Sequence, residues 1–156
     1  NDEAGRKERQ FNLLTTLQEW CQENNFKFMV EILVNQAQSK TLENIKEFGL
    51  FPELKSAIVE LAESGISPNI WKIEGLDSED HTRQIGELKF LEENNSELIV
   101  LGSGASLNDV ENWVENAAKA QNYSGFAVGR SIWQLPISMY FDGKLTKDKL
   151  TLVFSP

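Results

Sequence analysis

Apolar runs of strand length alternate along the chain with longer stretches in which apolar residues recur at helical spacing. The four apolar runs are Phe26–Val34, Asn69–Leu76, Glu97–Gly104 and Ser124–Arg130. Short apolar runs bounded by Gly, Pro or polar residues predict buried strands. Helical spacing predicts helices over Arg6–Glu23, from Phe51-Pro52 to Ser64, over Ser78–Glu93 and from Leu107 to Ala120, and a partly helical tail over Trp133–Leu152.

Strict alternation of strands and helices implies parallel strands joined by helical crossovers. An open doubly wound sheet and a (β/α)8 barrel both have this order, and four strand–helix units do not complete a barrel. No GxGxxG follows the first predicted strand, and no GxxxxGK[ST] occurs, which argues against the nucleotide-binding folds. The sequence predicts an α/β fold in which residues 1–156 form one domain or part of one.

Charge and composition narrow the class of partner. The 156 residues are 40% hydrophobic and 25% charged, and they carry a formal net charge of −9, which is typical of a globular protein and unfavourable for binding nucleic acid. No apolar run approaches the roughly 18 residues of a membrane span, and no signal peptide heads the chain. We therefore expect a cytoplasmic protein that binds neither nucleic acid nor a membrane.

Cys21 and His81 are the only residues of their types, so no intrachain disulfide can form. Cys21 is predicted on a helix face with Phe11, Leu14 and Leu17, and His81 on a solvated surface near a helix start. A Ser–His–Asp triad or a histidine metal site is not expected. We expect no metal and no cofactor.

Strand periodicity places ionisable groups on one face of the predicted sheet. In the second strand Lys72 and Glu74 share a face, and Trp71 and Ile73 occupy the other. The first strand has the same pattern, with Glu31 on the face away from its β-branched residues. Because unpaired charges are costly to bury, these side chains predict either a catalytic site or a Glu31–Lys72 ion pair without catalysis.

The catalytic interpretation makes Lys72 a nucleophile. A lysine amine attacks a ketone only when deprotonated, and partial burial favours the neutral form. The resulting iminium is an electron sink that allows a neighbouring C–C bond to break or form. A carboxylate within reach would move the protons, and both Glu31 and Glu74 are candidates.

The third and fourth predicted strands end in residues suited to phosphate. Gly102, Ser103 and Gly104 follow one strand and precede a helix that Ser106 and its capping-box partner three residues on should begin. Gly129 and Arg130 end the next strand and combine close backbone approach with a positive charge. The loops after the last two strands of (β/α)8 barrels commonly bind phosphate. Ordinary turns and a surface ion pair are the alternative.

The segments FMVEILV, PNIWKIEGL, VLGSGAS and GFAVGRSIW resemble the C-terminal half of a family of barrel aldolases. The family includes the tagatose-bisphosphate aldolases and the aldolase domain of inositol catabolism, which acts on a phosphorylated deoxy-keto-gluconate and is the closer likeness. The resemblance implies strands five to eight of a TIM (β/α)8 barrel and class I (Schiff-base) aldolase activity. It gives the Schiff base to Lys72, proton transfer to Glu31, and phosphate binding to Ser103, Gly129 and Arg130.

The family's strands one to four have no counterpart in this sequence. We therefore expect either a fragment that lacks its N-terminal half-barrel or a homodimer of half-barrels, with a phosphorylated small molecule as substrate. Three alternatives remain: a non-catalytic sugar-phosphate binding or regulatory module, a half-barrel assembly protein, and a metal-dependent lyase. The last would use Glu31, Glu74 and Asp77.

Overall fold

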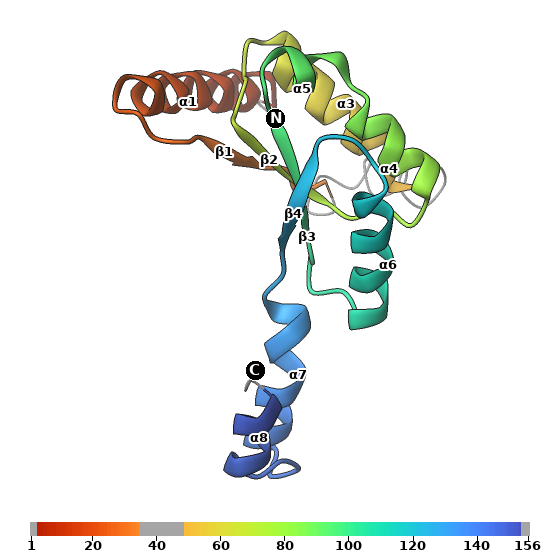
Figure 1. The fold of residues 1–156 in the computed structure, drawn as a ribbon. Helices are drawn as coiled ribbons and strands as arrows, with labels where there is room; N and C mark the ends of the chain where they lie inside the picture. Colours follow the sequence, from red (N-terminus) through yellow and green to blue (C-terminus); the bar gives the residue numbers. More distant parts are fainter. Residues whose placement is uncertain (1–2, 35–48, 154–156) are drawn as a thin grey trace.

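The computed structural model describes residues 3–34 and 49–153, in which four parallel strands form one sheet (Figure 1). The strands are β1 (Met29–Glu31), β2 (Ile70–Glu74), β3 (Glu97–Leu101) and β4 (Tyr123–Ala127). They lie in the order β1-β2-β3-β4, and every neighbouring pair is parallel. The predicted α/β class with parallel strands is confirmed.

Helices precede the sheet, connect its strands and follow it. They are α1 (Glu3–Glu23), α3 (Leu50–Glu63), α4 (Glu79–Gly86), α5 (Lys89–Glu93), α6 (Leu107–Ala118), α7 (Arg130–Phe141) and α8 (Lys147–Val153). The helix predicted over Ser78–Glu93 is two helices, because Leu88 adopts extended backbone (φ −66°, ψ 120°) between them. Gly86 ends α4 where a Cβ would overlap the carbonyl of Gln121. The side-chain amide of Asn122 donates to the Gly86 carbonyl at 2.9 Å, so a distant loop contacts the end of the helix.

The hydrophobic core lies between the sheet and the connecting helices. Alternate strand residues are buried on this side, and Trp71 is completely inaccessible. The buried core residues include Val30, Ile32, Trp71, Ile73 and Leu98 from the sheet and Leu54, Ile58, Ile85 and Leu91 from the helices. Burial of a large apolar side chain stabilises by roughly 1.5–3 kcal/mol. The predicted division of strand residues between two faces is confirmed on this side.

The other face of the sheet is open over β1. Met29 is 47% exposed there and Leu33 is 38% exposed, and Glu31 and Lys72 lie on the same face. Parallel sheets are usually covered on both faces. The ionisable side chains of β1 and β2 therefore face away from the core helices, on the side that the described residues leave accessible.

Helix α1 packs on the core through only part of its predicted face. Leu14 and Cys21 contact the core, but Leu17 is half exposed. Trp20 instead stacks on Phe26, with ring centroids 5.5 Å apart and planes 5° from parallel. The single-face prediction for this helix is therefore only partly confirmed.

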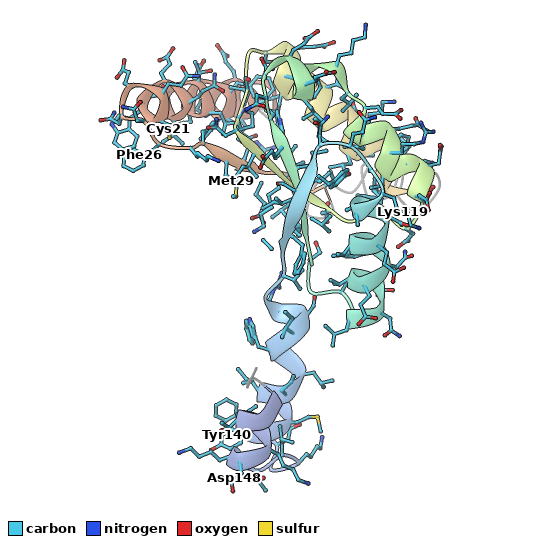
Figure 2. All side chains as sticks on the ribbon, in the orientation of Figure 1. Cys21, Phe26, Met29, Lys119, Tyr140 and Asp148 are labelled. Atoms are coloured by element: carbon cyan, nitrogen blue, oxygen red, sulfur yellow. The ribbon has the colours of Figure 1, made fainter. Side chains whose placement is uncertain are left out.

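Helices α7 and α8 pack against each other and project beyond the end of the sheet (Figure 1). Tyr140 and Asp148 lie at their far end (Figure 2). Helix α6 contacts β4, but Phe126 of this strand remains 58% exposed. Over the described residues, no helix is both long and apolar enough to cross a membrane.

His81 does not lie on a fully solvated surface, contrary to the sequence-based expectation. It is half-buried in the first turn of α4. Its ring stacks on Phe51 of α3, with centroids 4.2 Å apart and planes 8° from parallel. The prediction relied on the polar residues adjacent to His81 in sequence and therefore missed its aromatic partner in the preceding helix.

Candidate functional site

Glu31 and Lys72 form an ion pair on the open face of the sheet. Their Cα atoms are direct partners in the β1–β2 register, so the side chains leave neighbouring strands at the same level. The Lys72 Nζ lies 2.7 Å from the Glu31 Oε2, and the two side chains are 22% and 40% exposed. The predicted pairing of these residues across the two strands is observed, in a partly solvated setting.

A tight turn follows β3. The N–H of Ala105 donates to the Gly102 carbonyl at 2.8 Å, and the two central residues, Ser103 and Gly104, have φ of 50° and 81°. Positive φ at both central residues is the pattern of a type I′ turn, which is costly for a residue other than glycine. Gly102 is also constrained, because a Cβ there would lie 2.9 Å from the Val128 Cγ1.

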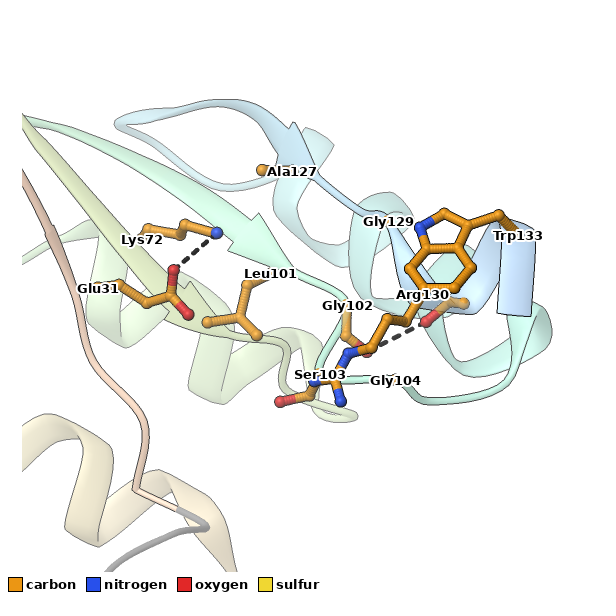
Figure 3. Close-up of a pocket in the computed structure, with 11 residues that line it drawn as sticks. Glu31, Lys72, Leu101, Gly102, Ser103, Gly104, Ala127, Gly129, Arg130 and Trp133 are labelled. Atoms are coloured by element: carbon orange, nitrogen blue, oxygen red, sulfur yellow. Dashed lines mark hydrogen bonds and ion pairs between the residues drawn. The ribbon is translucent and has the colours of Figure 1, made fainter. Parts of the chain in front are cut away.

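Arg130 begins α7 and lies beside this turn. A Cβ placed on Gly104 would be 3.7 Å from the Arg130 Cζ, so the guanidinium lies close to the turn backbone (Figure 3). The next residue, Ser131, donates its hydroxyl to the Gly102 carbonyl at 3.4 Å. The start of α7 is thereby tied to the end of β3.

One cavity of about 300 Å³ brings these groups together (Figure 3). All the predicted site residues except Glu74 line it. The lining consists of Glu31, Lys72, Leu101, Gly102, Ser103, Gly104, Ala127, Gly129, Arg130, Ser131 and Trp133. All four strands and the first turn of α7 contribute, because the carboxyl ends of parallel strands meet at one edge of a sheet.

Glu74 occupies a different position from the one predicted. Its side chain is buried, with 2% exposure. Its Oε2 accepts the N–H of Val34 at 2.8 Å, and its Oε1 accepts the hydroxyl of Ser103 at 3.2 Å. Glu74 thus contacts the turn through the Ser103 hydroxyl and does not line the cavity.

Sequence reasoning did not select Ser131 and Trp133, which also line the cavity. Trp133 lies one helical turn after Arg130, and residues three apart share a helix face. A helix start assigned at Arg130 would have placed the side chains of Arg130 and Trp133 on one face. The helical tail was instead expected from Trp133 onward, so this signal was missed.

The electrostatics of the cavity contrast with those of the whole chain. Lys72 and Arg130 bring two cationic groups into a protein of net charge −9. Ser103 and Gly104 add donors, because within the described part of the chain their N–H groups make no hydrogen bond to protein. Free backbone N–H groups beside a guanidinium favour an anionic ligand.

The three carboxylates of the metal-dependent alternative do not converge. Glu31 pairs with Lys72, and Glu74 is buried against Ser103. Asp77 accepts the indole N–H of Trp113 at 2.7 Å. No group of three or more His, Cys, Asp or Glu side chains with metal-site geometry occurs among residues 3–34 and 49–153.

Sequence comparison assigns the chain to a family. It belongs to the family described as "Uncharacterized protein conserved in bacteria (DUF2090)", which it matches over residues 1–154. No curated protein sequence matches the chain. The family description names no activity, so the site itself has to supply the functional argument.

Proposed function

We propose that the chain supplies the lysine and the phosphate-binding loops of a class I aldolase, a metal-independent carbon–carbon lyase acting on a phosphorylated keto sugar or keto acid. The observation that carries the proposal is the single cavity in which Lys72 and Glu31 meet the Ser103–Gly104 turn and Arg130. A substrate with both a carbonyl and a phosphate needs a nucleophile and an anion site in one enclosure. A lysine iminium is its own electron sink, so no cofactor is required.

In this proposal Glu31 moves the protons for Lys72. The carboxylate takes a proton from the ammonium across the 2.7 Å contact, which leaves a neutral amine. The amine attacks the substrate carbonyl, and the carbinolamine loses its hydroxyl as water with a proton returned by Glu31. When the neighbouring C–C bond breaks, its electron pair converts the iminium to an enamine, and the Glu31 carboxylate takes the proton of the hydroxyl on the departing carbon, which leaves as an aldehyde. Protonation of the enamine and hydrolysis of the resulting iminium release the ketone and free Lys72.

The substrate phosphate is assigned to the other side of the cavity. Arg130 contributes the positive charge, and the residues of the turn, Gly102, Ser103 and Gly104, contribute close backbone approach. Gly129 precedes Arg130 and also lines the cavity, where it lies beside the indole of Trp133. An anion held at this point would orient the carbonyl end toward Lys72.

A second candidate is a sugar-phosphate binding or regulatory module without catalysis. The Glu31–Lys72 contact at 2.7 Å favours it, because an ammonium held in an ion pair is not a nucleophile. In this function the same residues bind a phosphorylated ligand, and Lys72 forms no covalent bond to it.

We further propose that the four-stranded sheet is half of a (β/α)8 barrel, corresponding to strands five to eight. The sequential strand order, the core on one face and the open second face support this arrangement. Four more strands would come from an N-terminal half of the same polypeptide or from a second copy of the chain. A protein of this kind would act on its substrate in the cytoplasm. A purely structural half-barrel would form the same assembly and bind no ligand.

Borohydride trapping tests the lysine chemistry. The protein in its natural full-length form is incubated with dihydroxyacetone phosphate, reduced, digested and analysed by mass spectrometry. We expect a reduced adduct on Lys72 in the wild type and none there in Lys72→Met, with unchanged circular dichroism. The matched control is Lys119→Met, which removes a surface lysine paired with Glu79 at 2.8 Å and should leave trapping intact.

The outcomes separate the two candidate functions. An adduct confined to Lys72 supports the aldolase. Saturable binding of the phosphorylated ketone without an adduct refutes the Schiff base and favours the binding module. Adducts spread over surface lysines and equal in Lys72→Met also refute it. If the protein shows neither binding nor an adduct, the purely structural half-barrel is favoured.

A further inference from the structure

Glu74 joins the two ends of the candidate site without lining it. It is the last residue of β2, two positions after Lys72, and it is almost completely buried. One carboxyl oxygen accepts the N–H of Val34, which lies three residues beyond Glu31. The other accepts the hydroxyl of Ser103 in the turn after β3. A single side chain therefore spans from β1 to the turn.

The contact with Ser103 holds an unfavourable backbone conformation. Ser103 has φ of 50°, a left-handed value that L-residues other than glycine rarely adopt. Such conformations persist where surrounding contacts over-determine them. The hydrogen bond to a buried carboxyl group is one such contact, and the Ala105 N–H to the Gly102 carbonyl is another.

Glu74 is poorly placed to exchange protons with a ligand. It is absent from the residues that line the cavity, and its Oε1 accepts a hydrogen bond from the Ser103 hydroxyl. Glu31, by contrast, lines the cavity and contacts Lys72 directly. The two carboxylates thus have different surroundings, although both face away from the core in the strand pattern.

We propose that Glu74 is a positioning residue that fixes the anion-binding turn relative to Lys72 by holding Ser103 in its left-handed conformation. This inference rests on the proposed function for the identity of the ligand, a phosphate group. It assigns to Glu74 a role in phosphate affinity and none in proton transfer.

A double-mutant cycle with inorganic phosphate as the probe tests the inference in the full-length protein by isothermal titration calorimetry. Glu74→Ala in the wild-type background should raise the Kd by about tenfold or more. In a Ser103→Gly background the same substitution should raise it less than twofold, because glycine adopts positive φ without the hydrogen bond. Equal losses in the two backgrounds would overturn the inference, as would the absence of phosphate binding by the wild type.

The conservative variant separates positioning from proton transfer. In Glu74→Gln the amide can accept from Val34 and donate to the Ser103 hydroxyl oxygen, so the Kd should stay within threefold of wild type. An amide cannot exchange protons, so a catalytic Glu74 requires Glu74→Gln to stop turnover. If Glu74→Ala does not fold, Ser103→Ala breaks the same hydrogen bond from the turn and should weaken phosphate binding to the same degree. Unchanged affinity in Ser103→Ala contradicts the inference.

Trapping with two ketones distinguishes failure of this inference from failure of the aldolase. Glu74→Ala should raise the half-saturating concentration of dihydroxyacetone phosphate and leave that of unphosphorylated dihydroxyacetone within twofold. Equal effects on both ketones refute a role confined to the phosphate. If the wild type traps neither ketone, the aldolase fails, and the phosphate-binding cycle still decides the role of Glu74.

Discussion

Replacing Gly75 by alanine would place a methyl group inside the ring of Trp113. Gly75 directly follows β2 and is buried, and an ideal Cβ at this position overlaps the indole. The indole has little freedom to withdraw, because its Nε1 donates to the Asp77 carboxylate at 2.7 Å. Helix α6 is therefore docked on the end of β2 through a contact that only glycine permits.

The expected cost follows from two opposing effects. Forcing extra volume into a packed site costs about 1–3 kcal/mol, while alanine reduces the entropy of the unfolded chain and recovers about 0.4–1 kcal/mol. Displacing the indole also weakens its hydrogen bond, which contributes about 1 kcal/mol. The net loss is about 2 kcal/mol, or roughly 30-fold in the folding equilibrium at about 1.4 kcal/mol for each factor of ten.

Urea unfolding followed by circular dichroism measures this loss, and Gly125→Ala is the matched control. Gly125 lies in β4 with nothing within 4 Å of an added Cβ and without a positive φ, so its substitution should change stability by less than about 0.5 kcal/mol. Trp113→Ala should remove most of the penalty of Gly75→Ala in the double variant. Equal midpoints for Gly75→Ala and Gly125→Ala would refute the reasoning, as would additivity with Trp113→Ala.

Two further predictions concern titrating groups. The hydrogen bond from Arg83, followed by that from Gln84, lowers the pKa of Asp80 below its ordinary value of 3.8. The resulting stabilisation of the fold is complete above that value and is lost as the pH falls through the folded-state pKa. Arg83→Gln should therefore raise the pKa of Asp80 in a carboxyl NMR titration, and an unchanged titration would contradict this. Burial raises the pKa of Tyr123 above its ordinary value of 10.0. The protonated side chain therefore favours the folded state below pH 10, and this contribution to stability is lost as the pH rises above that value. Tyr123→Phe should therefore lose less stability than the wild type between about pH 9 and pH 11, and equal losses would show that another group controls alkaline unfolding.

The sequence was sufficient to predict features that depend on local periodicity. Trp71 and Ile73 alternate with Lys72 and Glu74, and a strand must send these two sets to opposite faces. This prediction needed only the positions of the strands. Lys72 meets the turn after β3 because the carboxyl ends of parallel strands share one edge.

Features set by contacts between distant segments were not predictable in this way. The end of α4 is contacted by Gln121 and Asn122 from a distant loop, and the sequence near Gly86 does not reveal these contacts. Glu74 has the same strand parity as Lys72, yet the neighbouring Val34 N–H and Ser103 hydroxyl draw its carboxyl group away from the cavity. Periodicity specifies the face of a side chain, whereas its partners determine its role.

The exposure of the Glu31–Lys72 pair connects the proposed chemistry with the proposed barrel. At 22% and 40% exposure both groups remain in contact with solvent, where an iminium would be open to premature hydrolysis and charges are strongly screened. Four further strands over the open face would exclude water from Lys72 and protect an iminium formed there from hydrolysis. The same strands would cover Met29 and Leu33, whose exposure has no benefit in an isolated sheet. The completion of the sheet and the protection of the iminium from water are therefore expected to depend on the same assembly.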